Sequence, residues 1–375
     1  MIYPNQFHMT SQVIGLKDLF NSLFNFNMNK INIKAAVLYE LNKPLVVEEI
    51  NIEELLPGQV LVKIFYSGVC RSQLMEARGL RGNDPWLPHL LGHEASGEVI
   101  SIGDGVNKVK IGDKVIIGWI KGDGIEAVGA KYTNSSGKII NSGKVTTFSN
   151  YSILSENRLI KLDEGVPLDV AVLFGCALPT GAGIVFNELK PVENESIAVI
   201  GLGGIGLSAL MALKEFKPKV VIAIDISDEK LKMAKEFGAT HLINSETQNA
   251  SIEINKIIPN GVDACVESGG QIETIELGIS IIKKTGRMYF ASHPEQGKFI
   301  KIDPFDLISG KKIYGSWGGG CKPDIDIPRL TNSYKSGTFP LNKLITKRYS
   351  LDQINEALSD LEKGLVFRPL IEMTH

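Results

Sequence analysis

Two patterns of apolar and polar positions divide the chain. From Ile33 to about Gly118, apolar residues form short runs, and residues 35–39, 59–64 and 97–102 are typical of strands. The turns that separate these runs are Pro57-Gly58, Gly103-Asp104-Gly105 and Gly112-Asp113. We therefore expect a mostly antiparallel β-domain in this part of the chain.

The pattern changes near Ala177. Apolar runs at 196–200, 220–224, 262–267 and 287–291 are of the buried-strand type, and helical stretches at 207–216 and 229–237 follow the first two. Strands that alternate with helices indicate a parallel, doubly wound sheet. The tail contains a predicted helix at 352–363 and a predicted final strand at 369–372.

Residues 1–30 stand apart as an N-terminal extension rich in Asn and Phe. Apolar residues recur there at helical spacing, which predicts a short amphipathic helix that packs on the body or on a partner subunit: Leu16, Leu19, Phe20, Leu23 and Phe24. The alternative is upstream sequence ahead of a natural start at Met28. A signal peptide is not expected, because the segment has no basic n-region and no small-residue cleavage site. A membrane-surface helix would need a Lys/Arg-rich polar face, which the segment lacks.

Composition narrows the classes of function. The 375 residues, 43% hydrophobic and 22% charged, are enough for two domains of ordinary size. The net charge of -2, without a long basic run, makes nucleic acid and anionic membranes poor partners. Four scattered cysteines are too few for a disulfide framework, and they fit a reducing cytoplasm. No run reaches the roughly eighteen apolar residues that span a bilayer.

A glycine-rich segment between the first strand and helix of the parallel sheet predicts a dinucleotide site. Gly201 permits the tight turn, Gly203 lets the backbone approach a pyrophosphate, and Gly206 lets helix and strand pack closely. The helix N-terminus supplies free N–H groups for the phosphates. Asp225, at the end of the next strand, would accept hydrogen bonds from the adenosine ribose. Its charge would repel a 2′-phosphate, so NAD is favoured over NADP.

Soft metal ligands accompany this signal. Cys70, His93 and Cys176 offer two thiols and one imidazole, although they are too widely spaced to form a compact zinc motif. Taken alone, either cysteine is more readily interpreted as a small core residue than as a ligand. Soft ligands beside a dinucleotide fingerprint nevertheless suggest one chemistry, in which Zn²⁺ polarises an alcohol or carbonyl and a nicotinamide exchanges a hydride with it.

Three segments resemble the zinc-containing alcohol dehydrogenases of the medium-chain dehydrogenase/reductase superfamily. They are Ser67-Gly68-Val69-Cys70-Arg71-Ser72, Gly92-His93-Glu94 with Gly97, Gly103 and Val106 at family spacing, and the segment 175–181 around Cys176. The resemblance runs from about Ala35 to the C-terminus. It implies Zn²⁺ on Cys70, His93 and Cys176, with a fourth position open for water or substrate. Glu94 looks like the family's carboxylate that can approach the metal; its alternative is a buried acid paired with a base.

The resemblance also implies roles in cofactor binding. Arg71 and Arg368 would contact the pyrophosphate, and each has a surface arginine as its alternative. Lys230 would reach the adenosine ribose, with a solvated helix lysine as the alternative. Thr180 and Ile205 would line the nicotinamide.

Two further residues would serve the substrate. Ser72 would hydrogen-bond the alcohol and start a proton relay, unless its hydroxyl only caps the local turn. Trp119 stands where the family places an aromatic wall beside the zinc; otherwise its indole packs in the β-core or over the shortened loop.

The sequence departs from the family in several places. Residues 119–151 contain no cysteine, so a second, structural zinc is not expected. Met75 occupies a position where some members have a relay histidine, and a thioether cannot pass a proton. Gln73 replaces the Asp that commonly supports the zinc-bound histidine, which leaves His93 less basic. His89 is interpreted as structural or solvent-exposed rather than as a ligand.

The resulting prediction is a GroES-like, β-rich catalytic domain of residues 31–177 and 321–375 around an inserted Rossmann domain of residues 178–320. The expected activity is zinc-dependent hydride transfer between an alcohol or carbonyl and NAD(H). The rivals are a zinc-free quinone or enoyl reductase of the same superfamily and a non-catalytic NAD-binding protein. The cysteine usage favours the cytoplasm, and the resemblance implies a homodimer or homotetramer with residues 312–317 as the edge strand of the interface.

Overall fold

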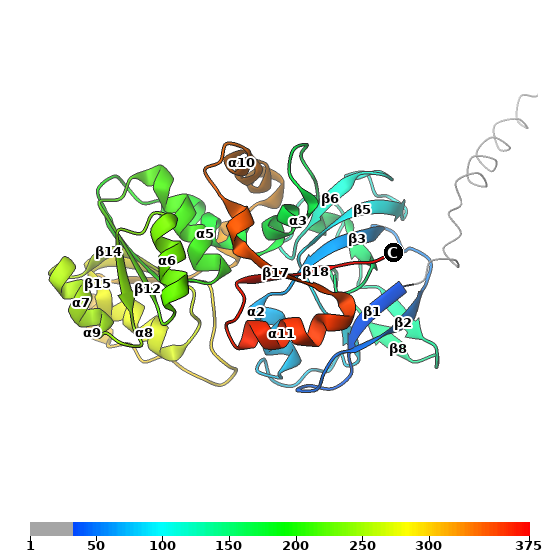
Figure 1. Ribbon diagram of the computed structural model, residues 1–375, viewed down its shortest axis with the longest axis horizontal. Coiled ribbons are helices and arrows are strands. Elements are labelled where there is room, and N and C mark those ends of the chain that lie inside the picture. The colour runs from blue at the N-terminus through cyan, green and yellow to red at the C-terminus, as the bar shows by residue number, and fades with distance from the viewer. Residues whose placement is uncertain (1–32) are drawn as a thin grey trace, which may run out of the picture. The chain divides into compact units, whose positions relative to one another are not determined.

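The computed structural model describes residues 33–375 (Figure 1). The helix expected within residues 1–30 lies outside the described residues. The domain boundaries given above stay a prediction.

The first half of the chain forms two β-structures, as the short apolar runs predicted. A closed barrel has the strand order β1 (Ile33–Leu38), β2 (Val46–Ile52), β7 (Lys131–Asn134), β8 (Ile139–Asn141) and β4 (His89–Leu90). A seven-stranded sheet has the order β10 (Leu159–Lys161), β6 (Lys114–Ile117), β5 (Ala95–Ile102), β3 (Gln59–Gly68), β18 (Arg368–Glu372) and β17 (Ile345–Ser350), with β9 (Tyr151–Ser155) also on β3. Most pairs are antiparallel; β17 with β18 and β4 with β8 are parallel.

The second half forms a six-stranded, fully parallel sheet. Its order is β13 (His241–Asn244), β12 (Val220–Asp225), β11 (Ser196–Ile200), β14 (Val262–Glu267), β15 (Ile282–Phe290) and β16 (Lys312–Gly315). This is the strand order of a dinucleotide-binding Rossmann sheet, in which ligands bind at the carboxyl ends of the strands.

Helices cover both faces of the parallel sheet. Alternate residues of β11 belong to two different cores: Val199 packs with residues of α5 (Gly204–Leu213) and α6 (Asp228–Glu236), whereas Ala198 packs with residues of α7 (Ala250–Ile257) and α8 (Ile272–Ile281). A strand buried on both faces must be apolar throughout. This requirement explains why these strands appeared in the sequence as continuous apolar runs.

The C-terminal segment returns to the antiparallel sheet. After α9 (Pro304–Ile308) and β16, the chain passes through α10 (Pro323–Lys335), β17, α11 (Ile354–Glu362) and β18 (Figure 1). Strand β18 pairs with β3, and β17 pairs with β18. The shorter helices are α2 (Arg71–Ala77), α3 (Leu168–Ala171) and α4 (Ala177–Gly183), the last continuing as a π-helix to Leu189. The two-part architecture expected from the sequence, GroES-like and Rossmann, is confirmed.

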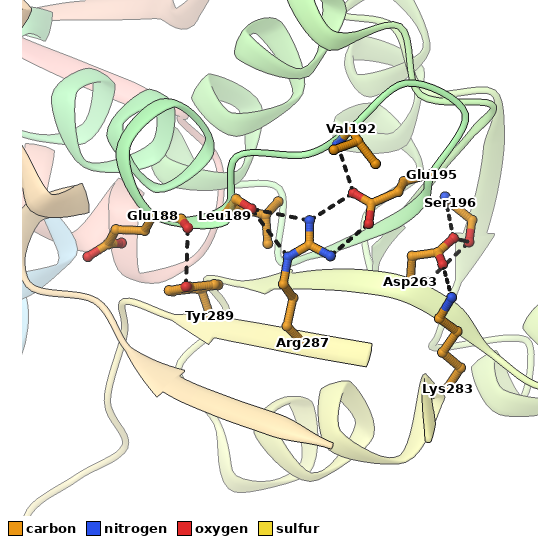
Figure 2. A network of polar contacts seen from close by, with 9 residues as sticks. All are labelled: Glu188, Leu189, Val192, Glu195, Ser196, Asp263, Lys283, Arg287 and Tyr289. Atoms are coloured by element: carbon orange, nitrogen blue, oxygen red, sulfur yellow. Dashed lines mark hydrogen bonds and ion pairs between the residues drawn. The ribbon is translucent and has the colours of Figure 1, made fainter. Parts of the chain in front are cut away.

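Charged side chains fasten the loop before β11 to the sheet (Figure 2). Both terminal nitrogens of Arg287 donate to the Glu195 carboxylate, at 2.8 and 2.7 Å, and the same guanidinium reaches the Leu189 carbonyl at 3.2 Å. The pKa of Glu195 is lowered by this hydrogen bonding to Arg287. Asp263 in β14 accepts bonds from the backbone N–H and the hydroxyl of Ser196.

Among residues 33–375, no single helix is long and apolar enough to cross a membrane. One bent pair of segments, Leu168–Gly175 with Ala177–Leu189, is sufficient by length and composition alone.

Candidate active site

The three predicted metal ligands come from three separate turns. Cys70 precedes α2, directly after β3; His93 lies between β4 and β5; Cys176 precedes α4. The Cys70 and Cys176 sulfurs are 3.9 Å apart, and His93 Nε2 lies 3.2 Å from the Cys176 sulfur. Together with a Glu94 oxygen, these atoms all lie within 4.8 Å of one another.

This arrangement fits a tetrahedral metal site. Zinc binds thiolate sulfur at about 2.3 Å, which places two sulfurs of a tetrahedron about 3.8 Å apart. Hydrogen bonding with Cys176 and the nearby His93 and Arg368 hold the pKa of the Cys70 thiol well below its usual value. Thiolate is the form that ligates metal, so this shift favours ligation by Cys70.

Glu94 and Arg368 form a buried ion pair beside this cluster. Their side chains are 0% and 6% exposed, and Glu94 Oε2 accepts from the guanidinium while Oε1 has no partner among the described residues. Burial raises the pKa of Glu94, although Arg368 opposes this shift. Arg368 also lies against the glycine turn, because a Cβ on Gly204 would be 3.1 Å from its Cδ. It therefore connects the metal cluster with the first turn of α5.

Gln73 contacts two of the candidate ligands. Its amide nitrogen meets His93 Nδ1, and its Oε1 accepts a weak bond of 3.3 Å from the Cys70 backbone N–H. The side chain is buried. Gln73 therefore helps to orient the imidazole of His93. It occupies the position at which the family commonly has a carboxylate.

Two of the three glycines of the predicted dinucleotide turn lie where a side chain would not fit. Gly201 has φ of +81°, and a Cβ on Gly206 would be 2.0 Å from the Gly201 carbonyl oxygen. Neither position tolerates a side chain. Asp225, at the end of β12, accepts bonds from the backbone N–H groups of Leu202, at 2.6 Å, and Ser227, at 3.0 Å. Lys230 Nζ lies 3.8 Å from the same carboxylate.

A cavity of about 340 Å³ brings most of the predicted site together. Its lining includes eight of the predicted residues: Cys70, Arg71, Ser72, His93, Trp119, Cys176, Thr180 and Ile205. Seven others lie outside its lining: Glu94, Gly201, Gly203, Gly206, Asp225, Lys230 and Arg368. The cysteine and histidine ligands and the residues expected at the nicotinamide and substrate thus share one space, whereas Glu94 and the residues expected at the adenosine ribose lie outside it.

Ser72 and Thr180 each follow a candidate ligand closely in the chain, and both line the cavity. The hydroxyl of Ser72 is buried and has no hydrogen-bond partner among residues 33–375, so it is free to bond a ligand. Thr180 donates its hydroxyl to the Cys176 carbonyl at 2.8 Å. Met75 also lines the cavity, as its place three residues after Ser72 suggests.

His89 has a structural role, as expected. It is buried, with Nε2 2.7 Å from an Asp84 oxygen and Nδ1 2.9 Å from the Leu90 carbonyl oxygen. Glu76, Asp84 and His89 form a second group of metal-ligand type, apart from the cysteine cluster. His89 and Asp84 contact each other directly, so neither side chain needs a metal ion as a partner.

Sequence reasoning missed several lining residues: Arg81, Gly269, Gly270, Gln271, His293, Ser316 and Trp317. The glycine pair 269–270 follows β14 at the carboxyl edge of the sheet, where ligands bind, so its position offered a signal. Trp317 offered none, because it looked like the end of an edge strand.

Two family models match the chain. The alcohol dehydrogenase GroES-like domain matches residues 56–164, and the zinc-binding dehydrogenase model matches residues 204–333. The first match covers strands β3 to β10, and the second covers every strand of the parallel sheet except β11.

Solved structures match it along most of its length. Benzyl alcohol dehydrogenase from Acinetobacter calcoaceticus is 30% identical with a TM-score of 0.81, and the match covers 92% of this chain and 100% of that one. An alcohol dehydrogenase zinc-binding domain protein from Burkholderia ambifaria is 28% identical, with a TM-score of 0.84 and the same coverages. The 2R,3R-butanediol dehydrogenase from Bacillus subtilis is 25% identical, with a TM-score of 0.73 and coverages of 91% and 99%. The chain belongs to the zinc-containing alcohol dehydrogenase family of the medium-chain dehydrogenase/reductase superfamily.

Proposed function

We propose that the protein is a zinc-dependent oxidoreductase that transfers a hydride between an alcohol or carbonyl substrate and NAD(H). The proposal rests on two thiols and one imidazole that converge in the cavity lined by Thr180 and Ile205. The two sulfurs are 3.9 Å apart, and His93 Nε2 is 3.2 Å from the Cys176 sulfur. Zinc in such a site supplies Lewis-acid polarisation of the substrate oxygen, and the nicotinamide accepts or donates the hydride.

The residues around the cluster would orient and serve the substrate. The Ser72 hydroxyl, buried and without a partner among the described residues, would bond the substrate oxygen and receive its proton during alcohol oxidation. Met75 cannot continue that relay, so the proton leaves by another route. Trp119 would form one wall of the substrate end.

Gln73 would act on the metal through His93. A metal on Nε2 leaves the imidazole proton on Nδ1, so the amide would turn its oxygen toward the ring. That rotation would release the 3.3 Å bond from the Cys70 N–H. A neutral amide makes the imidazole a weaker ligand than a carboxylate partner would.

Other residues would hold the cofactor. Asp225 would bond the adenosine ribose and disfavour a 2′-phosphate, and Lys230, 3.8 Å from that carboxylate, would approach the same ribose. Arg71 would contact the pyrophosphate at the cavity lining, and Arg368 would do so from beside Gly204. The first turn of α5 supplies free N–H groups for the phosphates.

We propose further that the chain associates as a homodimer or homotetramer through β16, the free edge of the parallel sheet. Five large apolar side chains in β16 and in the residues that precede it are exposed: Phe299, Phe305, Leu307, Ile308 and Tyr314. Exposed apolar patches of this kind are typical of subunit interfaces. With its free cysteines, the protein would work in a reducing compartment such as the cytoplasm.

Metal analysis tests the central proposal. Purified protein should contain about one equivalent of zinc, and Cys176→Ala should lose most of it together with NADH-dependent reduction of a panel of carbonyls. Cys265→Ala is the matched control, because that thiol is buried in β14 outside the cluster. Two tightly held equivalents would contradict the expectation of a missing structural site. Reduction of quinones or enones by metal-free protein would instead support a zinc-free reductase.

A further inference from the structure

Two indoles from distant parts of the chain meet at the cavity. Trp119 follows β6 and Trp317 follows β16, and their rings are 5.1 Å apart between centroids at an angle of 88°. Both side chains line the same space as the candidate metal ligands. Trp317 is 82% exposed, so most of its ring is free to contact a ligand.

A run of three glycines positions Trp317. Gly318, Gly319 and Gly320 all have positive φ, of 63°, 69° and 58°. A Cβ on Gly319 would be 2.3 Å from the Thr180 carbonyl oxygen, so this turn can lie on α4 only without side chains. The Gly319 N–H also donates to the Ser316 hydroxyl at 3.1 Å.

The same run leaves room for the other indole. A Cβ on Gly318 would be 3.3 Å from Trp119 Cζ2 and 2.9 Å from a side-chain carbon of Ile120. The turn therefore fixes Trp317 against Trp119 by close backbone packing. This packing makes the aromatic pair a defined feature of the cavity.

The remaining apolar lining continues this surface. Met75 and Leu80 come from α2 and the loop after it, and Ala291 and Pro294 come from the loop after β15. Aromatic rings pack on one another in offset or edge-to-face arrangements, which contribute about 0.5–1.5 kcal/mol beyond the burial of area. A flat aryl ring can pack on these indoles in the same offset or edge-to-face manner, which a non-planar aliphatic ring cannot do.

We propose that Trp317 is a specificity-determining residue which, with Trp119, selects alcohols and aldehydes whose reacting carbon carries an aryl or similarly flat, apolar group. The inference rests on the proposed function, since it places the substrate end of the cavity beside the metal ligands.

Turnover of matched aldehydes tests the proposal. Benzaldehyde and cyclohexanecarbaldehyde have the same carbon skeleton but differ in planarity. The parent protein should prefer benzaldehyde by about tenfold in kcat/KM, and Trp317→Ala should reduce this preference about fivefold, as expected for one ring contact. Trp317→Phe should retain most of it. Trp86→Ala is the matched control, because Trp86 is exposed and lies outside the lining.

Three further measurements separate the inference from the proposed function. Zinc content and NADH binding should be unchanged in Trp317→Ala. Saturation-transfer NMR with benzyl alcohol and cyclohexylmethanol reports the same selectivity without turnover. A parent that turns over no alcohol or carbonyl would refute the proposed function, and the NMR comparison would still decide the role of Trp317. An unaltered selectivity in zinc-loaded Trp317→Ala would overturn the inference.

Discussion

The choice between NAD and NADP should depend on Asp225. Its carboxylate is almost fully buried at the end of β12 and is held by the N–H groups of Leu202 and Ser227, at 2.6 and 3.0 Å. A ribose bonded to this carboxylate would bring any 2′-phosphate within about 4–5 Å of it. Two unit charges at about 4 Å interact by about 4 kcal/mol at an effective dielectric constant of 20.

Neighbouring groups reduce this repulsion. Lys230 Nζ lies 3.8 Å from the carboxylate and would attract the same phosphate. Solvent reaches the end of the strand, where Ile226 is exposed. We therefore expect a net discrimination of about 2–3 kcal/mol, which corresponds to a preference for NAD of about 30- to 150-fold.

Two substitutions separate charge from hydrogen bonding. Asp225→Asn removes the charge but keeps an oxygen for the Leu202 N–H, so it should narrow the preference to about tenfold or less. Asp225→Ser also loses the bond to Leu202, so it should narrow the preference for NAD by roughly tenfold or more. It should also weaken the binding of both cofactors by about 1 kcal/mol. The assay is kcat/KM for NADH and NADPH with one carbonyl, together with dissociation constants from NADH and NADPH fluorescence.

Asp228→Asn is the control. This residue is exposed three positions later and bonds Asn244, so removing its charge should leave the preference unchanged within about twofold. Equal use of both cofactors by the parent protein would refute the reasoning. So would a preference that survives intact in Asp225→Asn.

Two further predictions concern stability and assembly. Arg287→Ala should lower the free energy of unfolding by about 2 kcal/mol, because it removes charge-assisted hydrogen bonds to Glu195 (Figure 2). Lys256→Ala breaks only an exposed pair with Glu253 and should cost less than about 0.5 kcal/mol; equal losses in urea denaturation would contradict the argument. Ile308→Lys, at a side chain 80% exposed near β16, should shift the mass measured by light scattering toward the monomer. Leu365→Lys, outside this region, should leave the mass unchanged, and an unaltered assembly in Ile308→Lys would exclude that edge as the interface.

Burial decided which elements could be predicted from the sequence. The runs 196–200 and 262–267 coincide with β11 and β14, because strands covered on both faces must be apolar along their whole length. Helix α5 was expected from residue 207, but it begins at Gly204. The glycines that allow the close backbone approach carry no apolar signal, so the pattern could not locate the first turn.

Elements defined by tertiary contacts were not predicted. Helix α2 has seven residues, of which Arg71, Ser72, Gln73 and Glu76 are polar. Its position depends on β3 and on packing with α11 rather than on an apolar stripe. The ligands around it were predicted through the family resemblance of the segments that carry them, whereas Trp317 depends on how residues 318–320 lie on α4.

The resemblance predicted a role for Arg368 but not the contacts that its side chain makes. The sequence suggested a pyrophosphate contact, and the structure places the guanidinium on Glu94, a residue 274 positions away. The two arrangements are compatible, because a guanidinium has five N–H donors and Glu94 takes only part of them. Pairing of β18 with β3 brings Arg368 beside the metal cluster, and its Cδ and a terminal nitrogen face Gly204 at the start of α5. One buried side chain would thus neutralise Glu94 and direct its remaining donors toward the phosphate end of the cofactor.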